Sequence, residues 1–130
     1  MNLEKIIWVQ QESTTTLVIA NPKVNTISNQ VIKELIWALG EIEQEKRIKN
    51  VIITGEGNRF FSAGADIKEI AEFVLADEKS RRAREKIAFD FARRGQELIL
   101  RIKNFPKPVT ALVNGVCLGG GLEIALACRK

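Results

Sequence analysis

Two loops of small residues, and one carboxylate beside the second of them, are the features of this sequence that could do chemistry. The first loop is Phe61–Asp66 (FSAGAD) and the second is Asn114–Glu123 (NGVCLGGGLE). Small residues let a ligand approach the backbone closely. Each loop precedes a segment with a helical pattern, and the first N–H groups of a helix have no partner inside it. The sequence therefore predicts that both loops offer backbone N–H donors to a ligand.

If the two loops face one point, two N–H groups could bind a single oxygen atom that carries negative charge, which is an oxyanion hole. The helix macrodipole would add positive charge at the same place. Glu123 follows the three glycines Gly119–Gly121 by two residues, and we expect it to be partly buried and to act as a general acid or base beside the hole.

Plainer structural roles are available for the same residues. The glycines could serve only tight turns and close helix packing. Glu123 could merely complement the helix dipole, a contribution of about 0.3–1 kcal/mol, and Asp66 could simply cap a helix. A phosphate-binding loop of the Walker A type is excluded, because this loop ends in Gly-Leu-Glu rather than Gly-Lys-Ser/Thr. A dinucleotide fingerprint fails as well, because Ile124 stands where that motif has glycine or alanine.

Composition limits the chemistry further. The 130 residues contain no histidine and two cysteines, which excludes the usual Ser-His-Asp and Cys-His arrangements and argues against a metal site. The formal net charge of +4 arises in residues 101–130, and charges of both signs balance over residues 1–100, so we expect no nucleic-acid partner. No apolar run is long enough to cross a membrane and no signal peptide is evident. We expect a soluble, cytoplasmic protein.

The elements that must position the loops follow from hydrophobic periodicity and from glycine and proline punctuation. The predicted order is β-β-α-β-α-α-β-α, which indicates an α/β fold with helix-mediated connections. Ser28 is the expected N-cap of the first helix. The strands are predicted at Glu4–Gln11, Thr14–Ala20, Asn50–Thr54 and Val109–Val113, and the helices at Ser28–Arg47, Asp66–Leu75, Ser80–Ile102 and Leu122–Cys128.

With these motifs in place, the sequence resembles the enoyl-CoA hydratase/isomerase (crotonase) superfamily. The resemblance rests on Phe61–Glu69 and on Pro108–Gly115 running into Leu118–Glu123, with a further likeness at Asn21–Thr26. It implies a crotonase-like spiral of ββα units that binds acyl-CoA thioesters, with coenzyme A entering as part of the substrate and no permanently bound cofactor. It also implies a role in fatty acid metabolism.

The resemblance assigns roles to individual residues. The backbone N–H groups of Ala65 and Gly120 are implied as the oxyanion-hole donors. Glu123 matches the first of two catalytic glutamates in family hydratases, so hydration of 2-enoyl-CoA to 3-hydroxyacyl-CoA is expected. The implied contacts to coenzyme A or substrate are Lys23, Val24, Asn25, Ala63, Gly64, Ala65, Asp66, Ile67, Lys68, Gly119 and Gly120.

One departure from the family pattern concerns length. The second hydratase glutamate would fall near position 143, whereas the sequence runs to Lys130. Residues 1–130 are therefore interpreted as the N-terminal part of a crotonase-like domain, and a homotrimer or dimer of trimers is expected of a full-length chain. Two alternatives remain, a non-catalytic module that binds CoA esters or assists assembly, and another family activity such as isomerisation. A serine-protease use of the spiral is disfavoured by the lack of histidine.

Overall fold

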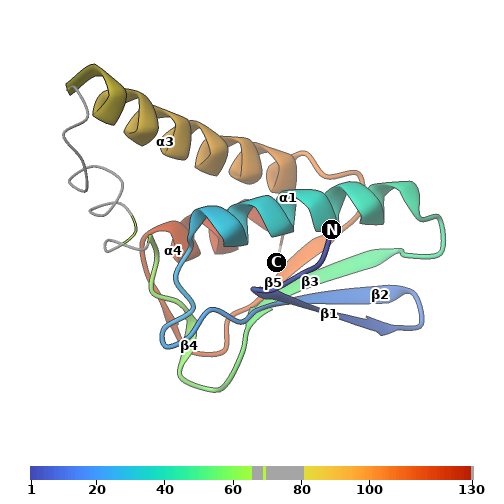
Figure 1. Cartoon of the computed structure of the whole chain (residues 1–130). Coiled ribbons are helices and arrows are strands. Elements are labelled where there is room, and N and C mark those ends of the chain that lie inside the picture. The colour runs from blue at the N-terminus through green and yellow to red at the C-terminus, as the bar shows by residue number, and fades with distance from the viewer. Residues whose placement is uncertain (66–68, 70–80, 130) are drawn as a thin grey trace.

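The computed structural model describes residues 1–65, 69 and 81–129 and confirms the predicted α/β architecture (Figure 1). The predicted helix at Asp66–Leu75 falls, apart from Glu69, outside the described residues. The described elements are β1 (Ile6–Gln11), β2 (Thr14–Ile19), α1 (Asn29–Gln44), β3 (Asn50–Gly55), β4 (Phe60–Ser62), α3 (Arg81–Lys103), β5 (Val109–Leu112), β6 (Val116–Cys117) and α4 (Gly120–Ala127).

The strands form two small sheets that repeat a single pattern. The larger sheet has the order β1-β2-β3-β5, in which β1 and β2 form an antiparallel hairpin and the other neighbours are parallel. The smaller sheet pairs β4 with β6 in parallel. In β3-β4-α3 and again in β5-β6-α4, the first strand joins the larger sheet, the second joins the smaller sheet, and a helix follows. These two ββα units are successive turns of the predicted spiral.

Helix α1 covers one face of the larger sheet, and α3 lies alongside α1 (Figure 1). The Ser28 hydroxyl accepts a hydrogen bond from the Val31 N–H at 3.2 Å, so Ser28 is the N-cap that the sequence predicts. Apolar residues recur along α1 with helical spacing and are fully buried against the sheet. These residues are Val31, Ile32, Leu35, Ala38, Leu39 and Ile42.

A buried carboxylate on α1 holds the segment that leads into β1. Glu34 is fully buried, and its Oε1 accepts hydrogen bonds from the backbone N–H groups of Glu4, Lys5 and Ile6 at 2.8–3.0 Å. Burial raises the pKa of Glu34, but the hydrogen bonds from these N–H groups and from the Gln30 side chain outweigh burial and hold the pKa below its ordinary value. The ionised Glu34 carboxylate therefore links α1 to the start of β1 through these hydrogen bonds.

Two boundaries differ from the sequence prediction. The predicted loop Phe61–Asp66 begins inside strand β4 (Phe60–Ser62), which is too short to show periodicity and exists by pairing with β6. Helix α1 ends at Gln44 rather than near Arg47. The Lys107 ammonium donates to the carbonyl oxygens of Ile42 and Glu45 at 2.6 and 2.7 Å and so satisfies that helix end.

Among the described helices, none is long and apolar enough to cross a membrane.

Candidate active site

The two glycine loops lie against each other. A Cβ atom added at Gly64 would lie 3.0 Å from the carbonyl oxygen of Leu118 and 3.3 Å from the nitrogen of Gly120. A Cβ atom added at Gly120 would lie 4.0 Å from the nitrogen of Ala65. Gly64 adopts a φ of +97°, which L side chains rarely adopt. Small residues are thus required for two backbone segments, 55 positions apart in the sequence, to approach this closely.

Backbone hydrogen bonds fix the approach of the two loops. The Leu118 N–H donates to the carbonyl oxygen of Ser62 at 3.0 Å, and the Gly64 N–H donates to the Ser62 hydroxyl at 3.1 Å. A Cβ atom added at Gly121 would fall 2.6 Å from the Ser62 Cβ. The first turn of α4 therefore rests directly on the end of β4, and Ser62, which is fully buried, connects the two loops.

Two N–H groups at this junction remain available to a ligand. The first is that of Gly120, the first residue of α4 and so one of the unsatisfied donors of a helix N-terminus. The second is that of Ala65. Ala65 forms an isolated parallel β-bridge with Ile27, but this bridge uses other backbone atoms. One of them is the Gly64 carbonyl oxygen, which accepts from the Ile27 N–H at 2.7 Å. Within residues 1–65 and 81–129, neither N–H donates a hydrogen bond. As far as the described residues go, an external oxygen atom could accept from both N–H groups.

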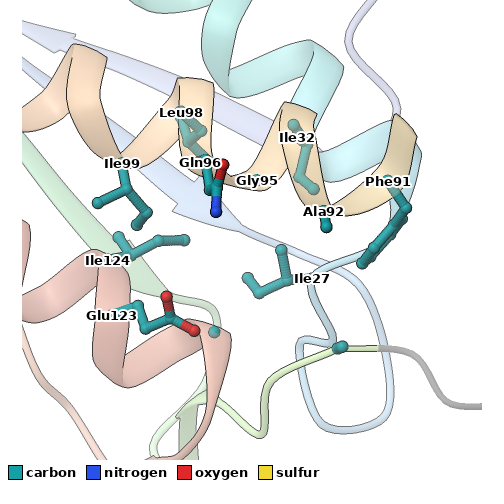
Figure 2. Close-up of a pocket in the computed structure, with 12 residues that line it drawn as sticks. Ile27, Ile32, Phe91, Ala92, Gly95, Gln96, Leu98, Ile99, Glu123 and Ile124 are labelled. Carbon is teal, nitrogen blue, oxygen red and sulfur yellow. The ribbon is translucent and has the colours of Figure 1, made fainter. Parts of the chain in front are cut away.

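A pocket of about 270 Å³ opens beside these N–H groups, between α3 and α4. Most of its wall is apolar, and Figure 2 shows the Glu123 carboxylate pointing from α4 into the space below α3. Among the described residues that line it, Glu123 is the only ionisable side chain. The lining residues are Ile27, Ile32, Ala65, Phe91, Ala92, Gly95, Gln96, Leu98, Ile99, Gly120, Glu123 and Ile124.

The exposure of Glu123 differs from the sequence expectation. We expected partial burial, whereas the structure leaves this residue exposed. The reason is that α4 buries only Gly121 and Ile124 against the rest of the chain, so Glu123 lies at the open side of the pocket. Glu123 lines the same pocket as Ala65 and Gly120, and water can still reach it.

The segment Asn21–Thr26 forms an early loop beside the first glycine loop, but its side chains do not line the pocket. The Ala63 N–H donates to the Val24 carbonyl oxygen at 3.0 Å, which joins the two loops. Asn25 is buried, and its amide donates to the carbonyl oxygens of Glu56 and Phe60. Its side chain thus has a structural role, and a ligand could reach only its backbone. Lys23 is exposed.

Three of the residues assigned from the resemblance, Asp66, Ile67 and Lys68, lie outside the described residues. Sequence reasoning missed the apolar wall of the pocket, which comes from Ile27 and from one face of α3. Helical spacing places Phe91 and Leu98 on one face of this helix, but spacing alone cannot separate a core face from a pocket wall. The glycine at position 95, inside a long helix, was the available signal.

The two thiols do not add a nucleophile to the site. Burial raises the pKa of Cys128 to about 11 and also raises the pKa of Cys117. Both thiols are therefore protonated near neutral pH, and the thiolate is the reactive form. Their small side chains pack against the core instead.

The chain is similar to known proteins over almost its whole length. Residues 10–129 match a family described as Enoyl-CoA hydratase/isomerase. The chain is 44% identical over 113 residues to a probable enoyl-CoA hydratase of Bacillus subtilis, covering 87% of this chain and 40% of that protein. It is 34% identical over 129 residues to a short-chain-enoyl-CoA hydratase of Clostridium acetobutylicum, covering 98% and 46%. The chain therefore spans less than half the length of these relatives.

Solved structures agree with this match. The crystal structure of an enoyl-CoA hydratase/isomerase from Xanthobacter autotrophicus superposes with a TM-score of 0.84 at 29% identity, covering 98% of this chain and 45% of that one. An enoyl-CoA hydratase from Bacillus anthracis superposes with a TM-score of 0.82 at 28% identity, covering 97% and 46%. The ββα units described above are thus shared with these proteins.

Proposed function

Because the chain belongs to the enoyl-CoA hydratase/isomerase family, we propose that it binds an acyl-CoA thioester between α3 and α4 and hydrates a 2-enoyl-CoA to the 3-hydroxyacyl-CoA. The observation that carries this proposal is the pairing of two unengaged N–H groups, those of Ala65 and Gly120, beside a carboxylate at an apolar pocket. The thioester carbonyl oxygen would accept both N–H donors, and the acyl chain would lie in the pocket.

The chemistry follows from this placement. Two N–H donors draw electron density toward the carbonyl oxygen, which makes C3 of the enoyl group electrophilic and stabilises the enolate that forms when water adds. The Glu123 carboxylate would accept a proton from the attacking water as its oxygen bonds to C3. The enolate then takes a proton at C2, which the carboxylic acid of Glu123 can return. Water is consumed, and no redox step or metal is needed.

Loss of Glu123 tests the catalytic part of the proposal. Glu123→Gln preserves the size of the side chain but cannot accept the proton, so we expect kcat for crotonyl-CoA hydration by the gene product to fall by about 10²–10⁴-fold. Binding of butyryl-CoA, which has no double bond to hydrate, should persist and provides the control. Equal turnover by wild type and variant would remove Glu123 from the mechanism.

A second function has one observation in its favour. Among the described lining residues no second carboxylate accompanies Glu123, which is itself exposed. A module that binds CoA esters without turnover, or that assists assembly, needs only the N–H pair and the apolar wall. Calorimetry with butyryl-CoA, run beside the hydration assay, separates the cases. Binding without turnover favours the module, and absence of binding rejects both functions. Isomerisation of an enoyl-CoA is the remaining family activity, and product analysis distinguishes it.

The proposal extends to the setting of the protein. Coenzyme A would enter and leave as part of the substrate, with no resident cofactor. A cytoplasmic location and a homotrimer or dimer of trimers for a full-length chain are also proposed, with residues 1–130 forming the N-terminal part of the domain. Sedimentation equilibrium of the gene product measures the assembly state, and a strict monomer would contradict that part.

A further inference from the structure

Gly95 occupies a position where the described structure does not require glycine. It lies in the interior of the 23-residue helix α3, where glycine is the least favourable residue after proline. A Cβ atom added there would meet no atom within 4 Å. Gly121 shows the contrary case, because its added Cβ would fall 2.6 Å from Ser62. Packing against the described residues therefore explains Gly121 but leaves Gly95 unexplained.

The open space beside Gly95 is the pocket itself. Ala92 and Ile99 stand three positions before it and four positions after it, so the three residues share one face of the helix. Figure 2 shows this face turned toward Ile27 and toward α4, which carries Glu123. A side chain at position 95 would therefore enter the pocket instead of the protein core.

We propose that Gly95 sets the length of acyl chain that the site accepts. This inference rests on the proposed function, because it takes the thioester carbonyl to be held by the N–H groups of Ala65 and Gly120. C3 of the acyl group then lies near Glu123, and carbons beyond it run along α3 past Gly95. The absent side chain leaves room for them, and apolar Phe91 and Ile99 flank that path. The favoured substrates are straight-chain CoA thioesters that extend several carbons beyond C3.

Binding measurements with non-reacting thioesters test this proposal on the chain as it exists. Dissociation constants for acetyl-, butyryl- and octanoyl-CoA would be measured by calorimetry for wild type and Gly95→Leu. Each buried methylene contributes roughly a fourfold gain in affinity. The leucine side chain displaces about three of them, so the preference for octanoyl-CoA over acetyl-CoA should fall at least about tenfold in the variant.

A matched control uses the same helix. Glu97→Leu also adds a leucine to α3, at an exposed residue outside the pocket lining and about 200° around the helix from position 95, and it should leave the chain-length preference unchanged. Gly95→Ala guards against misfolding of the leucine variant. It should raise Tm, because alanine favours the helix and the site is open. It should also lower the preference for octanoyl-CoA by about fourfold, the contribution of one buried methylene.

The outcomes are distinct. Selective loss of octanoyl-CoA binding in Gly95→Leu, with Glu97→Leu unchanged, supports the proposal. Equal changes for all three thioesters, or no change, overturn it while the proposed function stands. A lower Tm for Gly95→Ala would also overturn it, because packing would then demand the glycine. If wild type binds none of the three thioesters, the proposed function fails and this inference fails with it.

Discussion

Helices α1 and α4 are both rich in apolar residues, yet they are held in place differently. In α1, six apolar side chains are at most 1% exposed, and the helix covers the larger sheet. In α4, only Gly121 and Ile124 are buried, while Leu122 and Leu126 are 44% and 74% exposed. The helix with the better-buried side chains is the one without candidate catalytic groups.

The difference indicates how the molecule divides stability and chemistry. Side-chain burial fixes α1, so the core beneath it supplies most of the hydrophobic stabilisation. Backbone contacts fix the start of α4, where Gly121 rests on Ser62 and the preceding loop pairs with β4. Regions with few buried apolar contacts open more easily. We therefore expect α1 to exchange its amide hydrogens last and α4 to exchange them early.

The largest expected effect contrasts one leucine on each helix. Leu35→Ala in α1 removes a fully buried side chain and leaves a cavity, so the free energy of unfolding should fall by about 2–5 kcal/mol. Leu126→Ala in α4 removes a side chain that is 74% exposed and should change it by less than about 0.5 kcal/mol. Urea titration of both variants provides the measurement. Comparable losses would show that α4 is packed as firmly as α1.

A second contrast concerns two helical glycines. Gly121→Ala forces a methyl group against Ser62 and should destabilise the fold by about 1–3 kcal/mol. It should also weaken butyryl-CoA binding, because α4 must shift and carry the Gly120 N–H away from that of Ala65. Gly95→Ala in α3 should instead stabilise the fold by roughly 0.8–1 kcal/mol. Thermal melts with calorimetric titration distinguish the two, and wild-type behaviour of Gly121→Ala would contradict the close contact.

The third prediction concerns acid. The pKa of Glu34 is lowered in the folded state, so its contribution to stability is present above the unfolded pKa of about 4.3 and is lost as pH falls through the lower folded value. Glu34→Gln removes the charge from a buried acceptor and should cost about 1–2 kcal/mol near pH 7. The gap between wild type and variant should close below about pH 4.

The matching substitution on α4 serves as the control for this experiment. Glu123 is exposed, so Glu123→Gln should leave the free energy of unfolding close to that of wild type. Urea titrations at several pH values compare the two variants. If the difference in free energy of unfolding between wild type and Glu34→Gln stays constant from pH 7 to about pH 3, the charge of Glu34 does not contribute to stability.

The last prediction concerns the N-cap at the start of α1. Ser28→Ala removes the hydroxyl that accepts the Val31 N–H and should cost about 1 kcal/mol. Ser28→Asp keeps an acceptor at the same place and should restore most of that loss. Chemical denaturation resolves the difference, and equal stability of Ser28→Ala and wild type would mean that the cap adds nothing measurable.

Much of the fold could be predicted because local signals were strong. The period of apolar residues gave α1 and α3 within a few residues, and the polar turn between β1 and β2 indicated their hairpin. Strands β4 and β6 were missed because three and two residues carry no period. They exist through pairing with each other, a contact between segments more than 50 positions apart that no local pattern reveals.

The site was predictable in part for a similar reason. Glycine spacing indicated that the two loops offer backbone donors, because only small residues permit that approach, and the family resemblance assigned those donors to Ala65 and Gly120. The exposure of Glu123 depends on what covers α4, and the pocket wall on α3 depends on how two helices pack. Neither can be read from residue types along the chain. The structural role of the Asn25 amide was hidden in the same way, since its partners lie 31 and 35 positions away.

The central claim is that the N–H groups of Ala65 and Gly120 together hold a thioester carbonyl. Infrared difference spectroscopy of butyryl-CoA labelled with ¹³C at its carbonyl reports directly on the polarisation of the thioester C=O bond. Two N–H donors polarise the carbonyl, so its stretching frequency should shift to lower wavenumber on binding, and the shift should be smaller in Gly121→Ala. Bound thioester with an unshifted carbonyl band would contradict the account.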